Sequence, residues 1–566
     1  MALVHRGKVS LPLLALAALA LAGPAPAAEV SREIELRLNA GALPQWTAPE
    51  GRTATLWAAL QEFYAARAYA PAWLDGDTLR PQARALARAL ETAPAEGGDG
   101  RRYAVAAVAL AEGGPGDWPT ALAERDLRLS YGFLRLAQDL LEGRASPRGA
   151  SAYWAAPSAP ELDGPTVLRA ATGEEGPEPV LEGLRPLHPQ YAALLAVRAR
   201  LRAVEDGGGW PEVPALPALK RGARHPQLPL LRARLAADGD LPDGRHAPGV
   251  NPGAWPLAAH VPSGLRPQTP VGPAPRPDVF DRELEQALQR FQSRHGLPAL
   301  GRLDAATLAA LNVPVSARLR QVDLNLERWR WLPRALGERY VLVNVPAFEL
   351  FAVDGGRTAE RMKVVSGRAG ETPTPIFSAA MTTVIFSPWW NVPPRIAAEE
   401  VAPAALRSAS YLRRRGLQRV SDDGAMQFRQ PPGPGNPMGD VKFLLPNPFN
   451  VYLHDTPQDG AFAATRRDLS HGCIRIERPL ALARWALDDR TAWTDARLRA
   501  AMRARAERPV PLAGTIPVYV AYFTAWVEAD GRVRYLPDVY GHDAPQEPLL
   551  DGNGPWQRLA ELRSTD

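Results

Sequence analysis

The spacing of apolar residues changes near residue 340, and this change divides the chain into a helical part and a β-rich part. Before this point apolar residues recur at helical intervals, as Leu56, Leu60 and Phe63 do. From Tyr340 onward they alternate with the period of two that is typical of strands. A chain of 566 residues has room for roughly three to four domains of about 150 residues each. The sequence therefore predicts a multidomain α+β protein.

A proline-rich stretch interrupts the helical part. Ten prolines lie between Leu241 and Pro277, a density that excludes a continuous helix or an internal strand. Short helical patterns on both sides can close as a small bundle across this insertion. The predicted units are a helical scaffold domain at 28–205, a small helical domain at 206–315 with the insertion at 242–277, a β-rich domain at 338–528 with a capping segment at 394–440, and a C-terminal extension at 529–566.

The N-terminus has the pattern of a secretory signal peptide. Arg6 and Lys8 precede an apolar run from Leu11 to Ala22, and Ala25-Pro26-Ala27 has the small-x-small form of a cleavage site. No later stretch approaches the ~18 apolar residues that a transmembrane helix needs. We expect residues 1–27 to be removed and the mature protein to be exported without an integral membrane span. An uncleaved anchor is the alternative.

Charge and histidine content exclude two classes of partner. The formal net charge of +5 is too small to indicate nucleic acid, so arginine runs such as 413–415 are interpreted as solvated surface. The nine histidines are scattered rather than set at ligand spacing. We therefore expect neither a metal site nor a cofactor.

The only cysteine of the chain, Cys473, lies in the segment 470–475, nineteen positions after His454. A cysteine used as a nucleophile needs a nearby histidine or cation, because the thiolate is the attacking species. In an oxidising compartment a single cysteine has no internal disulfide partner, which favours a catalytic role over that of a small buried apolar residue. If residues 471–473 are extended, His471 and Cys473 share one face. Gly472 between them admits a close approach of substrate or backbone.

These residues resemble the signature of the L,D-transpeptidases. His454-Asp455-Thr456-Pro457 precedes Ser470-His471-Gly472-Cys473-Ile474-Arg475, with fifteen residues between His454 and Ser470. Residues 280–312 resemble the three-helix peptidoglycan-binding domain of cell-wall enzymes. Other segments resemble the large periplasmic class of the family, namely Trp390-Asn391-Val392-Pro393, Gly439 to Phe443, Tyr522 to Trp526 and Asp538 to Gly541. The resemblance covers nearly the whole mature chain, although the proline-rich stretch is longer than the usual connection.

The resemblance implies acyl transfer on peptidoglycan stem peptides in the periplasm. Cys473 would attack the carbonyl of the third residue of a tetrapeptide stem, release D-alanine and form a thioester. Attack by the amine of a neighbouring stem gives a 3→3 cross-link, whereas attack by water gives L,D-carboxypeptidase activity. The resemblance also implies that carbapenems inhibit the protein. Other cell-wall synthesis enzymes are its implied partners. A peptidoglycan-binding protein without activity is the remaining alternative.

The resemblance also assigns roles to the residues of the motif. His454 is the expected proton acceptor and donor, with Asp455 or its backbone carbonyl orienting it, and His471 is the second candidate for the base. The N–H groups of Gly472 and Cys473 are the expected oxyanion donors.

Substrate contacts are expected from residues around the motif. A planar guanidinium suits the carboxylates of a stem peptide, although solvated surface is the alternative for Arg467 and core packing for Trp390. The expected substrate-binding set is Ser470, Arg475, Arg467, Asn391, Trp390 and Asp455.

Overall fold

The computed structural model describes residues 26–47, 52–93, 103, 119–151, 153–155, 161–241, 277–422, 425–489 and 491–550. Residues 1–25 of the predicted signal peptide, nearly all of the proline-rich insertion and the end of the C-terminal extension lie outside these ranges. The described residues form two compact units. The first draws on residues up to 90, 101–135 and 163–180, and the second on 136–162 and the chain from 181 onward.

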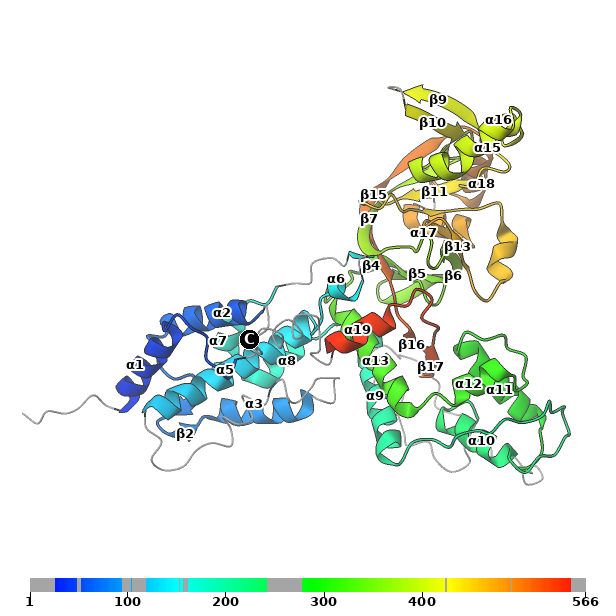
Figure 1. The fold of residues 1–566 in the computed structure, drawn as a ribbon. Helices are drawn as coiled ribbons and strands as arrows, with labels where there is room; N and C mark the ends of the chain where they lie inside the picture. Colours follow the sequence, from blue (N-terminus) through cyan, green and yellow to red (C-terminus); the bar gives the residue numbers. More distant parts are fainter. Residues whose placement is uncertain are drawn as a thin grey trace, which may run out of the picture. The chain divides into compact units, whose positions relative to one another are not determined.

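The first unit is helical, as the spacing of its apolar residues predicts (Figure 1). Its centre is the buried carboxylate of Asp126, which accepts hydrogen bonds from the hydroxyl of Tyr64 at 2.6 Å and from the N–H groups of Ala72 and Trp73, each at 2.8 Å. A buried carboxylate needs such partners, because burial alone raises its pKa. The elements of this region are α1 (Pro26–Leu38), α2 (Thr53–Ala65), β1 (Leu74–Asp75), β2 (Thr78–Leu79), α3 (Pro81–Thr92), α5 (Pro119–Leu141), α7 (Gly164–Thr172) and α8 (Pro177–Leu184).

A small helical bundle in the second unit joins the two sides of the proline-rich insertion. The side chains of Asp281 and Asp304 accept the N–H groups that open its second and third helices. Its core is made of leucine and phenylalanine side chains from all three helices, among them Leu231, Phe291 and Leu311. The bundle predicted across the insertion is thus confirmed, with helices α10 (Leu228–Ala237), α11 (Arg282–Arg294) and α12 (Ala305–Leu311).

A ten-stranded sheet forms the β-rich domain. Its strand order is β11-β12-β14-β6-β5-β4-β15-β7-β3, and β13 pairs with β6 beside this path. Because β11 also pairs with β7, the order returns on itself around a core that includes Val341, Phe386 and Ile474. The strands are β3 (Trp154–Ala155), β4 (Arg339–Asn344), β5 (Glu349–Asp354), β6 (Arg357–Gly367), β7 (Ile376–Phe386), β11 (Val441–Leu444), β12 (Leu453–His454), β13 (Asp468–Ser470), β14 (Ile474–Ile476) and β15 (Arg508–Ala521).

Helices of the second unit pack on this sheet. Trp329 stacks on Phe523 with ring centroids 4.2 Å apart, and His188 stacks on Trp329 at the same distance. The remaining elements are α6 (Pro147–Ala150), α9 (Pro189–Asp206), α13 (Val315–Arg330), α17 (Pro479–Leu487), α18 (Asp495–Arg503), the hairpin of β16 (Ala525–Val527) and β17 (Val533–Tyr535), and α19 (Asp543–Leu550).

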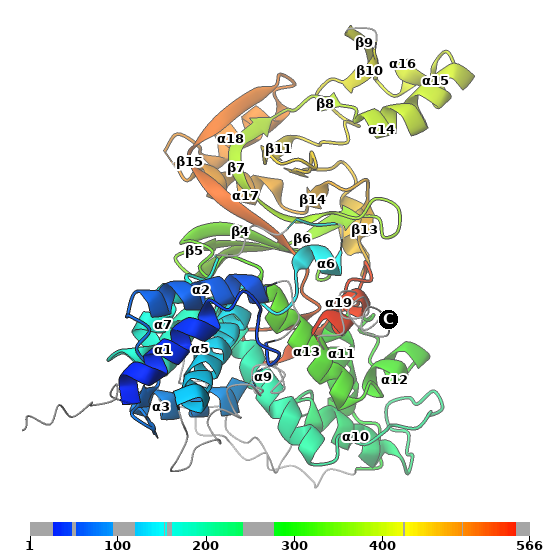
Figure 2. The same cartoon turned by 60° about the vertical axis from the view of Figure 1, so that its left-hand side comes forward.

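The capping segment folds as a lobe with its own sheet and core (Figure 2). This capping lobe begins at β8 (Trp390–Asn391), four residues before the predicted start, because β8 pairs with β10 (Ala425–Gln430) and Val392 belongs to the core of the lobe. Its other elements are α14 (Pro394–Ile396), a π-helical turn η4 (Ala397–Val401), α15 (Ala402–Arg407), α16 (Tyr411–Arg414) and β9 (Gln418–Asp422). We define it as residues 390–430.

Candidate active site

The cysteine lies at the end of a turn that reverses the chain. β13 pairs in parallel with β6, whereas β14 pairs with the same strand in the antiparallel sense, so the chain must reverse between them. Gly472 takes a φ of +115°, a value that favours glycine. Residues 471–473 are therefore not extended, and the premise that placed His471 and Cys473 on one face is wrong.

The turn is held by the side chain of Ser470. Its hydroxyl oxygen accepts the N–H of Gly472 at 3.1 Å and donates to the carbonyl of Cys473 at 2.6 Å. Ser470 is buried and its hydroxyl is used within the turn, so its contribution to substrate binding stays a prediction. The N–H of Gly472 is likewise occupied by this bond, so its role as an oxyanion donor stays a prediction. Among the described residues the N–H of Cys473 has no partner and remains the candidate.

One face of the sheet gathers the chemically important side chains. Lys442 on β11 lies opposite His454 on β12, and His454 lies opposite Arg475 on β14. Residues paired in register place their side chains on the same face of a sheet. Cys473 lies in the turn just before β14, where the phenol of Tyr452 and the charges of Lys442 and Arg475 act on its thiol. The ring of Tyr452 in turn lies 6.1 Å from that of His454. These five side chains form what we call the cysteine row: Lys442, Tyr452, His454, Cys473 and Arg475.

The thiol of Cys473 is half-buried and free. Burial raises its pKa, while hydrogen bonds from the backbone and phenol of Tyr452 and the charges of Lys442 and Arg475 oppose that rise. The sulfur lies 3.8 Å from the carbonyl oxygen of Asn450. Because burial prevails, the resting group is a thiol with cationic and hydrogen-bonding side chains around it.

Sequence reasoning missed Tyr452 and Lys442 as parts of the site. The ammonium of Lys442 lies 3.7 Å from the centroid of the Tyr452 ring, a cation–π contact. Burial lowers the pKa of Lys442, and the neighbouring Cys473 opposes that shift. The position of Tyr452 two residues before His454 was the signal that could have found it, since alternate residues of a strand share a face.

His454 is buried, 3% exposed, and held as a neutral imidazole. Burial lowers its pKa to about 3, an effect that Arg475 and Lys442 increase. Its Nδ1–H donates to the backbone carbonyl of Asp455 at 2.5 Å, which leaves the lone pair on Nε2.

The orienting group of His454 is thus the carbonyl of Asp455 and not its carboxylate. That carboxylate instead accepts the N–H groups of Asp440 and Thr456, each at 2.7 Å, and burial raises its pKa to about 6. The Asp455 carboxylate thus contacts backbone N–H groups, and its contribution to substrate binding stays a prediction.

His471 points to the capping lobe. Its Nε2 lies 2.8 Å from a carboxylate oxygen of Glu400 on η4, and both side chains are exposed. The structure therefore brings His454 into the row with Cys473 and places His471 against another element.

The other predicted substrate residues differ in their surroundings. Arg475 donates to Gln458 at 2.7 Å beside the cysteine. Arg467 is 8% exposed and donates to the carbonyls of Ala464 at 2.7 Å, Phe348 at 3.0 Å and Val364 at 3.1 Å. Its guanidinium therefore connects backbone segments and is not solvated surface, while its binding of a stem peptide stays a prediction.

Trp390 and Asn391 belong to the capping lobe. Trp390 is half-buried against the core of the lobe, whereas Asn391 is exposed on β8. Among the described residues, neither Trp390 nor Asn391 has a hydrogen bond, ion pair or ring contact with the cysteine row, so their contribution to a donor pocket stays a prediction.

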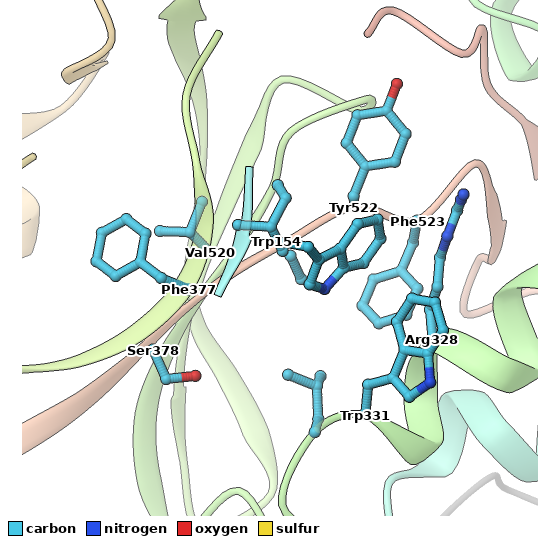
Figure 3. Close-up of a pocket in the computed structure, with 11 residues that line it drawn as sticks. Trp154, Arg328, Trp331, Phe377, Ser378, Val520, Tyr522 and Phe523 are labelled. Carbon is cyan, nitrogen blue, oxygen red and sulfur yellow. The ribbon is translucent and has the colours of Figure 1, made fainter. Parts of the chain in front are cut away.

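A separate cavity lies between α13, β7 and β15, where Trp154, Trp331 and Phe377 line it (Figure 3). The guanidinium of Arg328 at its wall donates to Gln546 at 2.9 Å and pairs with Asp543 at 2.6 Å. None of the predicted site residues lines it. Within the described ranges, no three His, Cys, Asp or Glu side chains gather as a metal site would require.

Three segments of the chain match models of known protein families. Residues 338–520 match the model of the "L,D-transpeptidase catalytic domain", residues 268–311 that of the "Putative peptidoglycan binding domain" and residues 58–197 that of the "Scaffold domain". A curated protein of Haemophilus influenzae, named "Putative L,D-transpeptidase", is 27% identical over 281 residues, which are 46% of this chain and 56% of that protein. The chain thus spans about half the length of this curated relative.

Solved structures of low identity are also similar. An L,D-transpeptidase from Mycobacterium smegmatis is 14% identical with a TM-score of 0.19, over 32% of this chain and 58% of that one. One from Stackebrandtia nassauensis is 14% identical with the same TM-score, over 54% of this chain and 97% of that one. On the matches to the family models, the chain carries a catalytic domain of the L,D-transpeptidase family, together with a peptidoglycan-binding domain and a scaffold domain.

Proposed function

We propose that the protein is an L,D-transpeptidase that forms 3→3 cross-links between peptidoglycan stems through a thioester on Cys473. The observation that carries this proposal is the cysteine row, in which Tyr452 contacts both the thiol of the only cysteine and the ring of the buried His454, in a region that matches the catalytic domain of this family. Export to the periplasm, with residues 1–27 removed, is part of the same proposal. No helix within the described ranges is long and apolar enough to cross a membrane.

In the proposed acylation the sulfur of Cys473 attacks the carbonyl carbon of the third stem residue. The thiol proton passes to Nε2 of His454, which is neutral at pH 7 because burial lowers its pKa to about 3. An imidazolium at this buried position is favourable only beside the negative charge that develops on the reacting atoms, so proton transfer is coupled to attack. The proton then moves to the departing amine, the C–N bond breaks and D-alanine leaves.

In the proposed transfer step the amine of a second stem attacks the thioester. His454 takes a proton from the attacking nitrogen and returns it to the departing sulfur, so the enzyme ends in its starting state. Water in the place of the amine gives a tripeptide and makes the protein an L,D-carboxypeptidase. Arg475 and Lys442 supply positive charge beside the sulfur, where the carboxylates of a stem peptide are to be bound.

Mass spectrometry of the products tests the proposed function. Residues 28–566 are incubated with a disaccharide-tetrapeptide, with Cys473→Ala as the matched control. We expect dimers that have lost one D-alanine, because the thioester partitions to the amine of a second stem. Tripeptide alone would favour a carboxypeptidase, and the absence of any product that depends on Cys473 would favour a binding protein.

Removing the charge of Lys442 is expected to slow the reaction of the thiol. Lys442→Met keeps the length of the side chain, and the loss of one nearby cation should raise the pKa of Cys473. The thiolate fraction at pH 7 falls as this pKa rises, so alkylation by iodoacetamide should slow severalfold. Lys220→Met, at an exposed position of the small helical domain, is the control and should react as the wild type does. Equal rates for Lys442→Met and wild type would exclude Lys442 from the environment of the thiol.

A further inference from the structure

A threonine behind the cysteine turn bonds directly to it. The hydroxyl of Thr374 donates to the carbonyl of Gly472 at 2.8 Å and accepts the N–H of Gly367 at 2.8 Å. Thr374 is fully buried, and a Cβ added to Gly367 would lie 3.0 Å from the Cα of Gly472. The end of β6 and the turn are therefore in backbone contact, with the Thr374 hydroxyl between them.

A tyrosine from the C-terminal extension holds this arrangement from the other side. The hydroxyl of Tyr540 donates to the carbonyl of Gly367 at 2.6 Å and accepts the N–H of Thr374 at 3.2 Å. Tyr540 is itself fixed, since its N–H donates to the hydroxyl of Tyr522 at 2.7 Å and that hydroxyl donates to Asp538 at 2.6 Å. A series of hydrogen bonds, linked through Tyr540 and Thr374 themselves, thus connects Asp538 to the cysteine turn.

This series of hydrogen bonds ends at the peptide unit between Gly472 and Cys473. The carbonyl of Gly472 and the N–H of Cys473 belong to the same planar peptide unit. Fixing the carbonyl with the Thr374 hydroxyl therefore fixes the direction of the N–H. That N–H has no partner among the described residues and is the candidate oxyanion donor.

We propose that Thr374 and Tyr540 are positioning residues that aim the N–H of Cys473 at the oxyanion. The inference rests on the proposed acyl transfer, because only a reaction that passes through an oxyanion uses this donor. It assigns a purpose to the segment from Asp538 to Tyr540, which lies outside the residues that match the family model of the catalytic domain. The thiol itself should retain its intrinsic reactivity when these hydrogen bonds are removed.

Two reactions of the same sulfur distinguish loss of the orientation of the Cys473 N–H from damage to the site as a whole. Acylation by a carbapenem passes through an oxyanion, whereas alkylation by iodoacetamide does not. Thr374→Val should slow carbapenem acylation of the full chain by about 10²-fold, the usual effect of losing one oxyanion donor, with alkylation unchanged within about twofold. Thr374→Ser keeps the hydroxyl and should restore acylation. With stem substrate, Thr374→Val should lower kcat and leave KM unchanged.

Tyr540→Phe tests the hydrogen bonds that the Tyr540 hydroxyl makes to Gly367 and Thr374. It should slow acylation by about tenfold, since a small misplacement of a reacting group already costs a large factor in rate. Tyr535→Phe is the matched control, because the buried hydroxyl of Tyr535 has no partner among the described residues.

Wild-type rates of acylation in both Thr374→Val and Tyr540→Phe would overturn the inference, as would an equal loss of alkylation. A wild-type protein that neither stem nor carbapenem acylates would overturn the proposed function instead.

Discussion

Replacement of Cys473 by alanine is expected to abolish both cross-link formation and any covalent carbapenem adduct. The variant lacks the only sulfur nucleophile of the chain, and loss of a catalytic nucleophile typically costs about 10⁴-fold or more in rate. The products of stem turnover and the intact mass of the protein after carbapenem treatment measure the two effects. We expect neither a dimer, nor a tripeptide, nor an increase in protein mass.

The fold of the Cys473→Ala variant should survive. The sulfur is half-buried, and its hydrogen bond to the carbonyl of Asn450 is a long one of 3.8 Å. The midpoint of thermal unfolding should therefore stay close to that of the wild type, which separates loss of chemistry from loss of structure. Formation of product or of a carbapenem adduct by this variant would contradict the assignment of Cys473 as the nucleophile.

The architecture could be predicted from sequence because periodicity reports on burial. The change from helical to alternating spacing near residue 340 coincides with the start of β4, and the helices on both sides of the proline-rich insertion pack as one bundle. The start of the capping lobe was harder to predict. Pairing between β8 and β10 joins segments more than thirty residues apart, and no local pattern specifies such a pairing.

The site could be predicted only where residue type carries the chemistry. Cys473 and His454 were named by residue type, and in the structure both lie beside Tyr452. The surroundings of Arg467 could not be predicted, because sequence does not reveal that backbone carbonyls surround its guanidinium. The contacts of Ser470 and Gly472 within the turn could not be predicted either, because the reversal between β13 and β14 depends on how each pairs with β6. Contacts made through tertiary pairing decide the role of each polar group.

Replacement of His454 by alanine is expected to slow acylation at pH 7 by about 10²-fold or more, the usual contribution of a general base. Because burial lowers the pKa of His454 to about 3, the imidazole is neutral throughout the range from pH 5 to 8. The wild-type rate should therefore be flat over that range, with no inflection near pH 6.5, and should fall only as the pH approaches the pKa of the base.

The pH profile identifies the base more sharply than the rate at one pH. Without His454 the reaction depends on the thiolate fraction, and burial holds the pKa of Cys473 above its ordinary value. The rate of His454→Ala should then rise about tenfold for each pH unit, so that the deficit shrinks as the solution becomes more alkaline. His471→Ala is the matched control and should keep the flat profile, since His471 contacts Glu400 of the capping lobe. A flat profile and full rate for His454→Ala, together with a steep profile for His471→Ala, would transfer the role of base to His471.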